Sequence, residues 1–121
     1  MQGNSQISAV VDRYFEGLYK GDVDLLRSVF HPQAQLFGEV RGKPYHNTLD
    51  GYLTAVAGRP SPHAKAEPFE MQLLSVEVVN QVASVRARCP MLGLIYIDFL
   101  SLANDGTGWR IVNKTFTHVD A

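Results

Sequence analysis

Residues 93–118 read GLIYIDFLSLANDGTGWRIVNKTFTH, and this stretch decides the fold. Two apolar runs rich in β-branched and aromatic residues flank the turn residues NDGTG, a pattern typical of a β-hairpin. Each run contains one ionisable residue, Asp98 in the first and Lys114 in the second. If the five turn residues form the loop, Ala103 pairs with Trp109, and Asp98 then faces Lys114 across the hairpin. Because an isolated charge is costly to bury, the two residues are expected to neutralise each other or to hold a ligand.

The segments before the hairpin predict three helices and then further strands. Apolar residues at helical spacing, with capping residues at the ends, predict helices from Asn4 or Ser5 to Gly21, from Asp22 to Pro32 and from Asn47 to Gly58. Alternating apolar residues predict strands over Ala34 to Val40, Phe69 to Val79 and Val82 to Cys89. Three helices packed on an antiparallel sheet make an α+β fold. The 121 residues fit a single domain that spans residues 1–121.

Composition excludes several classes of partner. The chain carries 11 basic and 12 acidic residues with no run of like charge, so neither nucleic acid nor an anionic membrane is an expected partner. The N-terminal residues MQGNSQIS lack the basic and apolar regions of a secretory signal, and no apolar stretch is long enough to cross a membrane. Cys89 is the single cysteine, which excludes an internal disulfide and is expected to be a small buried thiol. These features predict a soluble cytoplasmic protein.

No cofactor or metal is expected. The four histidines, at positions 31, 46, 63 and 118, have no metal-ligand spacing, and Cys89 has no partner motif. Gly106 and Gly108 belong to the hairpin, so they do not form a phosphate-binding loop between a strand and a helix.

Strand pairing extends the charged pair to a row of three. A turn centred on Leu92 would place Arg86 beside Asp98, so that Arg86, Asp98 and Lys114 would lie in line on one sheet face, although a one-residue slip would break the row. Two readings of this row stay open. Inside the fold, Asp98 would act as a general base or orienting group, and the two cations would hold an anionic or enolate-like oxygen. On the outer face, the row would be a salt-bridge ladder, either solvated or packed across a dimer interface.

Several motifs resemble those of a known superfamily. They are YFEGL at residues 14–18, GD at 21–22, FHPQA at 30–34, Gly38 followed by Gly42, YIDFLSL at 96–102 and GWRIVNKTF at 108–116. In this order and spacing they resemble the nuclear transport factor 2-like superfamily, which includes ketosteroid isomerase, scytalone dehydratase and the SnoaL-type polyketide cyclases. More narrowly, the chain is similar to the putative lumazine-binding family. The resemblance covers nearly the whole chain and implies a curved sheet wrapped around the helices, a pocket at the open end of a cone, and a homodimer formed through the sheet.

The candidate site residues follow from the pattern and the resemblance together. Asp98 and His31 are the candidate catalytic residues, although a histidine at a helix junction also suits a capping role. The predicted ligand-binding residues are Tyr14, Phe37, Tyr52, Arg86, Tyr96 and Lys114. The resemblance places Tyr14 where isomerase-like members present a phenol to the pocket, while a tyrosine on an apolar helix stripe also suits the core. Steroid-type isomerisation uses two acids beside the tyrosine, and a single Asp98 is available here, which counts against it.

Two hypotheses of function remain. The first is a small-molecule pocket protein, either a cofactor-free lyase or isomerase-type enzyme or a simple ligand binder. The alternative is a non-catalytic dimerisation or interaction module whose cone is filled by its own side chains. In both cases three short helices can cover only one apolar face of the sheet, so we expect a homodimer that buries the other face.

Overall fold

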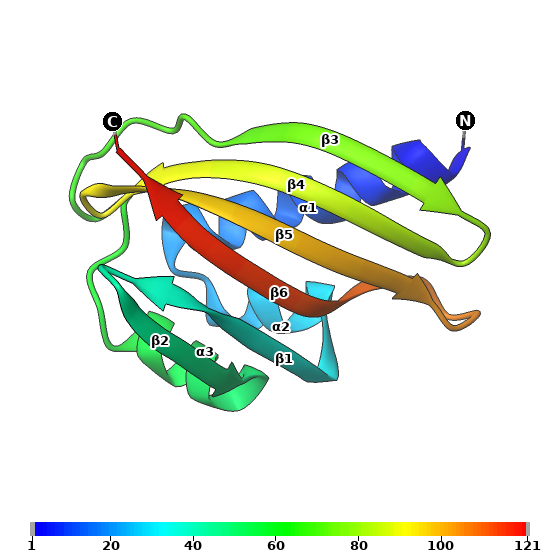
Figure 1. Ribbon diagram of the computed structural model, residues 1–121, viewed down its shortest axis with the longest axis horizontal. Helices are drawn as coiled ribbons and strands as arrows, with labels where there is room; N and C mark the ends of the chain where they lie inside the picture. Colours follow the sequence, from blue (N-terminus) through cyan, green and yellow to red (C-terminus); the bar gives the residue numbers. More distant parts are fainter. Residues whose placement is uncertain (1, 121) are drawn as a thin grey trace.

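A computed structural model describes residues 2–120 of the chain. The elements, in order, are α1 (Gln2–Lys20), α2 (Val23–Val29), β1 (Phe30–Val40), β2 (Lys43–Thr48), α3 (Leu49–Ala57), β3 (Gln72–Val79), β4 (Val82–Met91), β5 (Leu94–Asn104) and β6 (Trp109–Val119). The strands form one sheet in the order β2-β1-β6-β5-β4-β3 (Figure 1). Strand β1 runs parallel to β6, and the other neighbouring strands are antiparallel. The α+β fold that the sequence predicts is confirmed.

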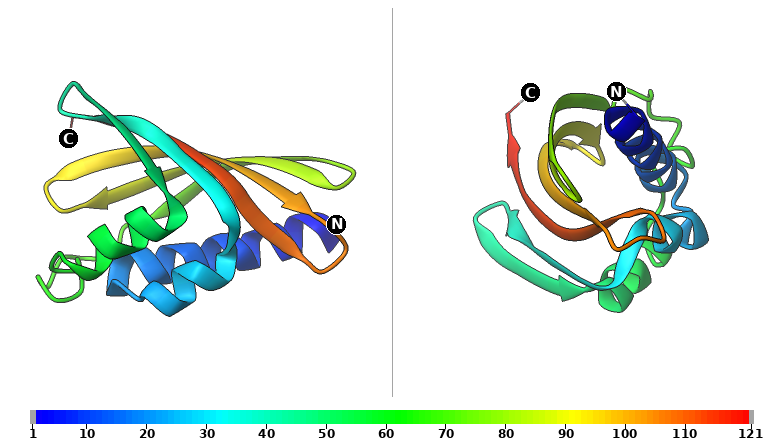
Figure 2. Two further views of the ribbon diagram at one scale, coloured as in Figure 1. Left: turned by 90° about the horizontal axis from the view of Figure 1, so that it is seen from below. Right: turned by 90° about the vertical axis from the view of Figure 1, so that its right-hand side faces the viewer.

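The three helices lie on one side of a strongly curved sheet, and the core fills the space between them (Figure 2). Helix α1 buries the apolar stripe that its periodicity predicts, namely Ile7, Val10, Val11, Tyr14 and Leu18. Strand β4 buries every second residue from Ala83 to Met91 against the helices. The inner face of the sheet is therefore the face on which a buried site can form.

The turn between α1 and α2 follows the sequence prediction. Gly21 has a φ of 66°, a left-handed conformation that glycine adopts without steric cost. Asp22 then caps α2, and its carboxylate accepts a hydrogen bond from the backbone N–H of Leu25 at 3.0 Å. Because α2 ends at Val29 and β1 begins at once, His31 lies inside β1, whereas the sequence predicted that this strand begins only at Ala34.

The sequence reading missed β2 and replaced it with a turn and the start of a helix. The structure has a tight turn at Arg41 and Gly42, both with positive φ, and β2 then pairs with β1 from Val40↔Lys43 to Gln35↔Thr48. Thr48, rather than Asn47, caps α3 and accepts a hydrogen bond from the N–H of Gly51 at 3.2 Å. Pro44 is tolerated because β2 is the edge strand of the sheet.

The predicted register between β4 and β5 is wrong by one residue. The two strands are joined by Leu92 and Gly93, both with positive φ, so Met91 pairs with Leu94 and the turn is not centred on Leu92. Arg86 therefore pairs with Phe99, and Asp98 pairs with Ala87. Since side chains alternate between faces along a strand, this shift moves Arg86 to the outer face of the sheet.

The register between β5 and β6 departs from the prediction by two successive one-residue shifts. The loop holds four residues instead of five, because Asn104, not Ala103, pairs with Trp109. A bulge at Val112 adds the second shift, since Leu102 pairs with Ile111 while Ser101 pairs with Asn113. As a result Trp109 and Ile111 are buried on the inner face together with Asp98 and Lys114, whereas the predicted register put them on the face opposite that pair.

None of the helices described within residues 2–120 combines the length and the apolar character that crossing a bilayer requires.

Candidate functional site

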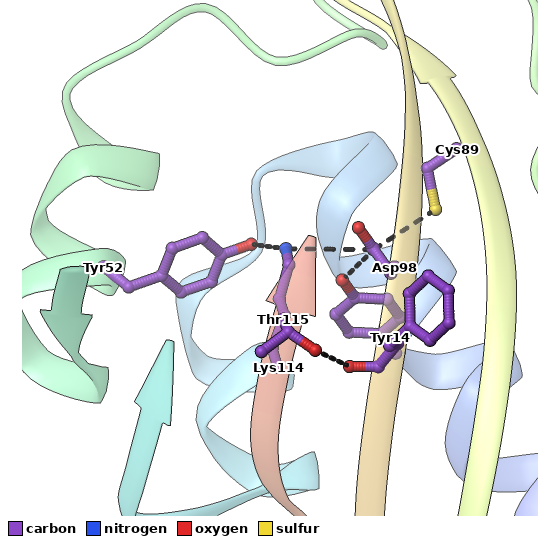
Figure 3. A network of polar contacts seen from close by, with 7 residues as sticks. Tyr14, Tyr52, Cys89, Asp98, Lys114 and Thr115 are labelled. Carbon is purple, nitrogen blue, oxygen red and sulfur yellow. Dashed lines mark hydrogen bonds and ion pairs between the residues drawn. The ribbon is translucent and has the colours of Figure 1, made fainter. Parts of the chain in front are cut away.

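A polar network lies buried on the inner face of the sheet, centred on the carboxylate of Asp98 in β5 (Figure 3). Asp98 is 1% exposed. The phenol of Tyr14, from α1, donates a hydrogen bond to Oδ2 at 2.5 Å, and the thiol of Cys89, from β4, lies 3.6 Å from the same oxygen. The ammonium of Lys114, from β6, lies 3.8 Å from Oδ2. Three elements besides β5 therefore converge on one carboxylate oxygen.

The neighbouring strands leave room for this network. In the sheet Asp98 lies between Ala87 of β4 and Phe116 of β6, and Phe116 pairs in turn with Gly38 of β1. A Cβ atom at Gly38 would collide with the backbone oxygen and the ring of Phe116, so glycine is needed for β1 to approach β6 at this point. Ala87 and Gly38, which lie on either side, are small and thus leave room between them for the carboxylate of Asp98 and the ring of Phe116.

Aromatic rings surround the ammonium of Lys114. The Nζ atom lies 4.9 Å from the ring centre of Tyr52, 5.2 Å from that of Phe116 and 5.4 Å from that of Tyr14. It also donates a hydrogen bond to the hydroxyl of Tyr52, in α3, at 3.4 Å. Contact with the faces of aromatic rings stabilises a cation that is otherwise removed from water. The site therefore holds a buried positive charge without an extensive set of hydrogen bonds.

The surroundings fix the protonation of three groups in the network. Burial, and then the negative charge of Asp98, raise the pKa of Tyr14 well above its usual value, so its phenol remains a donor. Burial by itself lowers the pKa of Lys114, but the Asp98 carboxylate outweighs it and raises that pKa, so the side chain stays an ammonium. Burial and Asp98 also raise the pKa of the Cys89 thiol, which suits the small buried thiol that the sequence predicts rather than a nucleophile.

The network forms the floor of a small cavity. The cavity has a volume of about 70 Å³ and is lined by Val40, Tyr45, Tyr52, Arg59, Met91, Tyr96, Asp98, Lys114 and Phe116. That volume holds about two water molecules. Asp98 Oδ1 is buried and has no hydrogen-bond partner among the described residues. The second oxygen of the carboxylate is thus an acceptor that the protein itself leaves open.

The structure brings together five of the predicted site residues. The cavity is lined by Tyr52, Tyr96, Asp98 and Lys114, and Tyr14 donates a hydrogen bond to Asp98. The charged pair therefore lies on the inner face, although Lys114 pairs across the strands with Leu100 and not with Asp98.

The remaining three predicted residues lie elsewhere. Phe37 is 45% exposed on the outer face, where it stacks on His46 with ring centres 4.3 Å apart. Arg86 lies over the ring of Phe99 at 4.8 Å, also on the outer face. The Nδ1 atom of His31 accepts a hydrogen bond from the N–H of Gln33 at 3.0 Å, a local contact at the start of β1. None of the three lines the cavity, because strand register and the early start of β1 direct them away from it.

Five lining residues were not predicted as site residues from the sequence, namely Val40, Tyr45, Arg59, Met91 and Phe116. Tyr45 lies in β2, which the consecutive residues Arg41 and Gly42 could have indicated, since a glycine in a two-residue turn often joins two strands. Arg59 follows α3 in a segment read as an exposed loop, and nothing in the local sequence indicates that it lines a cavity.

Among residues 2–120, no group of three or more His, Cys, Asp or Glu side chains is placed to hold a metal ion. The cavity instead offers one open carboxylate oxygen, one ammonium, one guanidinium and several phenols. These groups can accept and donate hydrogen bonds to a small molecule and can take up a proton from it.

Comparison with known proteins assigns the family. A family described as "Putative lumazine-binding" matches residues 2–117. The chain belongs to this family. Among curated proteins, none matches this member of the putative lumazine-binding family at a significant level.

Solved structures support the same fold for this putative lumazine-binding family member. A protein from Shewanella baltica, described as NTF2-like and of unknown function, is 24% identical with a TM-score of 0.86, covering 99% of this chain and 96% of its own. A protein from Silicibacter pomeroyi, described in the same way, is 22% identical with a TM-score of 0.82, covering 98% and 97%. A third, from Methylobacillus flagellatus, is 21% identical with a TM-score of 0.82, covering 99% and 94%. At these identities the likeness establishes the nuclear transport factor 2-like fold.

Proposed function

We propose that the protein binds a small molecule in the cavity above Asp98, with Oδ1 as the acceptor for a hydrogen bond from the ligand. The observation that carries the proposal is this oxygen: it is buried and has no partner in residues 2–120, and its residue, Asp98, lines the cavity. Leaving a buried acceptor unsatisfied costs about 1 to 3 kcal/mol. A ligand that supplies a donor removes this cost, while water can supply it in the free protein.

The walls of the cavity favour a planar ligand. Tyr45, Tyr96 and Phe116 are half-buried, and their rings meet edge to face at centre distances of 5.2 and 5.9 Å. Pockets for small organic ligands usually measure about 300 to 1,000 Å³. A ring-sized ligand therefore requires some of these side chains to turn aside. Membership of the putative lumazine-binding family supports heterocycles with ring N–H donors as first candidates.

The same groups would suit a lyase or isomerase reaction that needs no cofactor. Asp98 is positioned to remove a proton from a carbon beside a carbonyl group, with Oδ1 as the base. Lys114 is a fixed cation 3.8 Å from Oδ2 and would stabilise the oxygen of the resulting enolate. Return of the proton to another carbon would complete an isomerisation.

A binding screen tests the proposal. Isothermal titration and thermal-shift measurements with pterin- and lumazine-like rings and with aromatic acids should find compounds that bind the wild type. Asp98→Asn should abolish this binding, because it removes the charge and replaces one of the two acceptor oxygens by an amide group that donates hydrogen bonds. Asp105→Asn is the control, since Asp105 is a fully exposed carboxylate in the β5–β6 loop. If no compound binds the wild type, the proposal fails.

The small volume of the cavity supports a second candidate, a dimerisation module formed through the outer sheet face. A row of outward side chains crosses four strands there, namely Phe37, Thr115, Phe99 and Arg86. Phe37 and Phe99 are 45% and 43% exposed. A second copy of the chain would cover this row through a two-fold interface of more than about 1,000 Å².

Sedimentation at micromolar concentration tests the dimer. The wild type should sediment as a dimer and Phe99→Asp as a monomer, because the substitution replaces an exposed aromatic ring of the row by a carboxylate. The control is Val82→Asp, at the exposed first residue of β4. A monomeric wild type removes this second candidate.

A further inference from the structure

The charges that line the cavity do not balance. Asp98 and Lys114 form an ion pair and offset each other. Arg59 also lines the cavity, and within residues 2–120 its guanidinium has no ion pair or hydrogen-bond partner. Arginine stays protonated in proteins, so the lining carries one excess positive charge. A positive charge of this kind is best matched by a negative charge on the ligand.

The open acceptor and the excess charge lie at different depths. Asp98 is 1% exposed, whereas Arg59 is half-buried, so part of its side chain reaches solvent. The backbone N–H of Arg59 donates a hydrogen bond to the carbonyl of Val56 at 3.4 Å, so the backbone of Arg59 is held at the end of α3. The rings of Tyr45, Tyr96 and Phe116 line the same cavity and are also half-buried, so with Arg59 they form its rim.

From this arrangement we infer that the ligand is a small planar monoanion with a hydrogen-bond donor at the end opposite its anionic group. The donor binds Oδ1 of Asp98, the ring lies among the rim aromatic residues, and the carboxylate or other anionic group pairs with Arg59. Arg59 is then the residue that selects anionic over neutral ligands. The inference rests on the proposed small-molecule function and names the class of ligand for the same cavity.

Other charge states fit less well. A cation would meet the unpaired guanidinium of Arg59 on entry. A dianion would need a second free positive charge, and Lys114 is already paired with Asp98. A neutral ligand would satisfy Oδ1 but would partly desolvate Arg59 without giving it a partner, which is unfavourable.

Three matched probes test the inference by isothermal titration. They are 4-hydroxybenzoate, which has both groups, 4-hydroxybenzamide, which lacks the charge, and 4-methoxybenzoate, which lacks the donor. The wild type should bind 4-hydroxybenzoate at least about tenfold more tightly than either of the others, since a hydrogen bond to a charged group is worth about that factor or more. In Arg59→Gln, affinity for the hydroxybenzoate should fall to that of the benzamide, while affinity for the benzamide stays unchanged.

The control variant is Arg88→Gln, which removes an equally half-buried arginine from the outer-facing side of β4. It should keep the preference for the anion, and both variants should keep the wild-type melting temperature.

Two kinds of failure are distinguishable. Equal wild-type affinity for the benzoate and the benzamide, or an unchanged preference in Arg59→Gln, overturns the anion inference. Binding that is still lost in Asp98→Asn then leaves the proposed function standing. If neither these probes nor the wider screen of heterocycles binds the wild type, the proposed function fails and the inference fails with it.

Discussion

Lys114 lies opposite Leu100 in the β5–β6 hairpin and reaches Asp98 diagonally along the inner sheet face, with Nζ 3.8 Å from Oδ2. This contact depends on the bulge at Val112. If Val112 were paired with Ser101 in regular register, Lys114 would pair with Phe99 and point to the outer face, and the Asp98 carboxylate would be buried without a cation.

The ion pair should be strongly coupled in stability. Replacing Asp98 or Lys114 by Ala leaves the other charge buried, which should lower the free energy of unfolding by about 3 to 5 kcal/mol in each case. The double variant should lose less than the sum, because no isolated charge remains. Urea unfolding of the four proteins gives the coupling energy. Strictly additive losses would show that the two side chains do not act as partners.

The phenol of Tyr14 should stabilise the fold through its bond to the carboxylate. Tyr14→Phe removes a donor to a charged group, so the free energy of unfolding should fall by about 1.5 to 3 kcal/mol. Tyr19→Phe is a matched control on the same helix, because its hydroxyl donates to a neutral carbonyl, that of Glu67, at 2.6 Å. That change should cost about 0.5 to 1.5 kcal/mol. Equal losses in the two variants would argue against a charged acceptor at Asp98.

Stability should fall at alkaline pH. Burial raises the pKa of Cys89 above its ordinary value of 9.0 and that of Tyr14 above 10.0, and the charge of Asp98 raises that of Lys114 above 10.5. In each case the folded state binds the proton more tightly than the unfolded state. The contribution of each group to stability is therefore fully present at pH values below its ordinary pKa and is lost as the pH rises above that pKa.

Urea unfolding between pH 7 and pH 11 should therefore show a decline that starts near the ordinary pKa of the thiol and steepens as Tyr14 and Lys114 begin to contribute. Cys89→Ala should delay the onset, whatever its effect on stability at pH 7. A wild-type curve that stays flat throughout this range would contradict the buried, protonated state of these three groups.

Gly38 should not tolerate a side chain. In Gly38→Ala the new methyl group would collide with the backbone oxygen and the ring of Phe116, which should destabilise the protein by about 1 to 3 kcal/mol. Gly58→Ala is the control, because its nearest neighbour would be the carbonyl oxygen of Thr54 at 3.5 Å and its φ is negative. That variant should change the melting temperature little. Similar melting temperatures for the two variants would show that β1 can move away from Phe116.

The sequence by itself determined the class of fold and the buried face of the first helix. The helical spacing from Ile7 to Leu18 was sufficient to place these side chains on one apolar face, and the alternation in β4 was sufficient to predict a strand. These properties depend on neighbours a few residues away, since helical and strand periodicities are local. Local alternation also predicted correctly that Asp98 and Lys114 share a sheet face, although the predicted register was wrong. The two one-residue shifts add up to two residues, which is a full period of the strand, so the face is unchanged.

Only the tertiary structure decided which residues form the cavity. The predicted β4–β5 register is wrong by one residue. The prediction therefore put Arg86 in the site, whereas in the structure it lies on the outer face. Turn length and the Val112 bulge set the register. The alternative registers differ little in how well they suit the local sequence preferences of the two strands. Arg59 and Tyr45 line the same cavity as Asp98 because β2 and α3 pack on β1, and β1 pairs with β6 from the far end of the chain. Such contacts depend on how the whole sheet curves around the helices, which no short segment of sequence specifies.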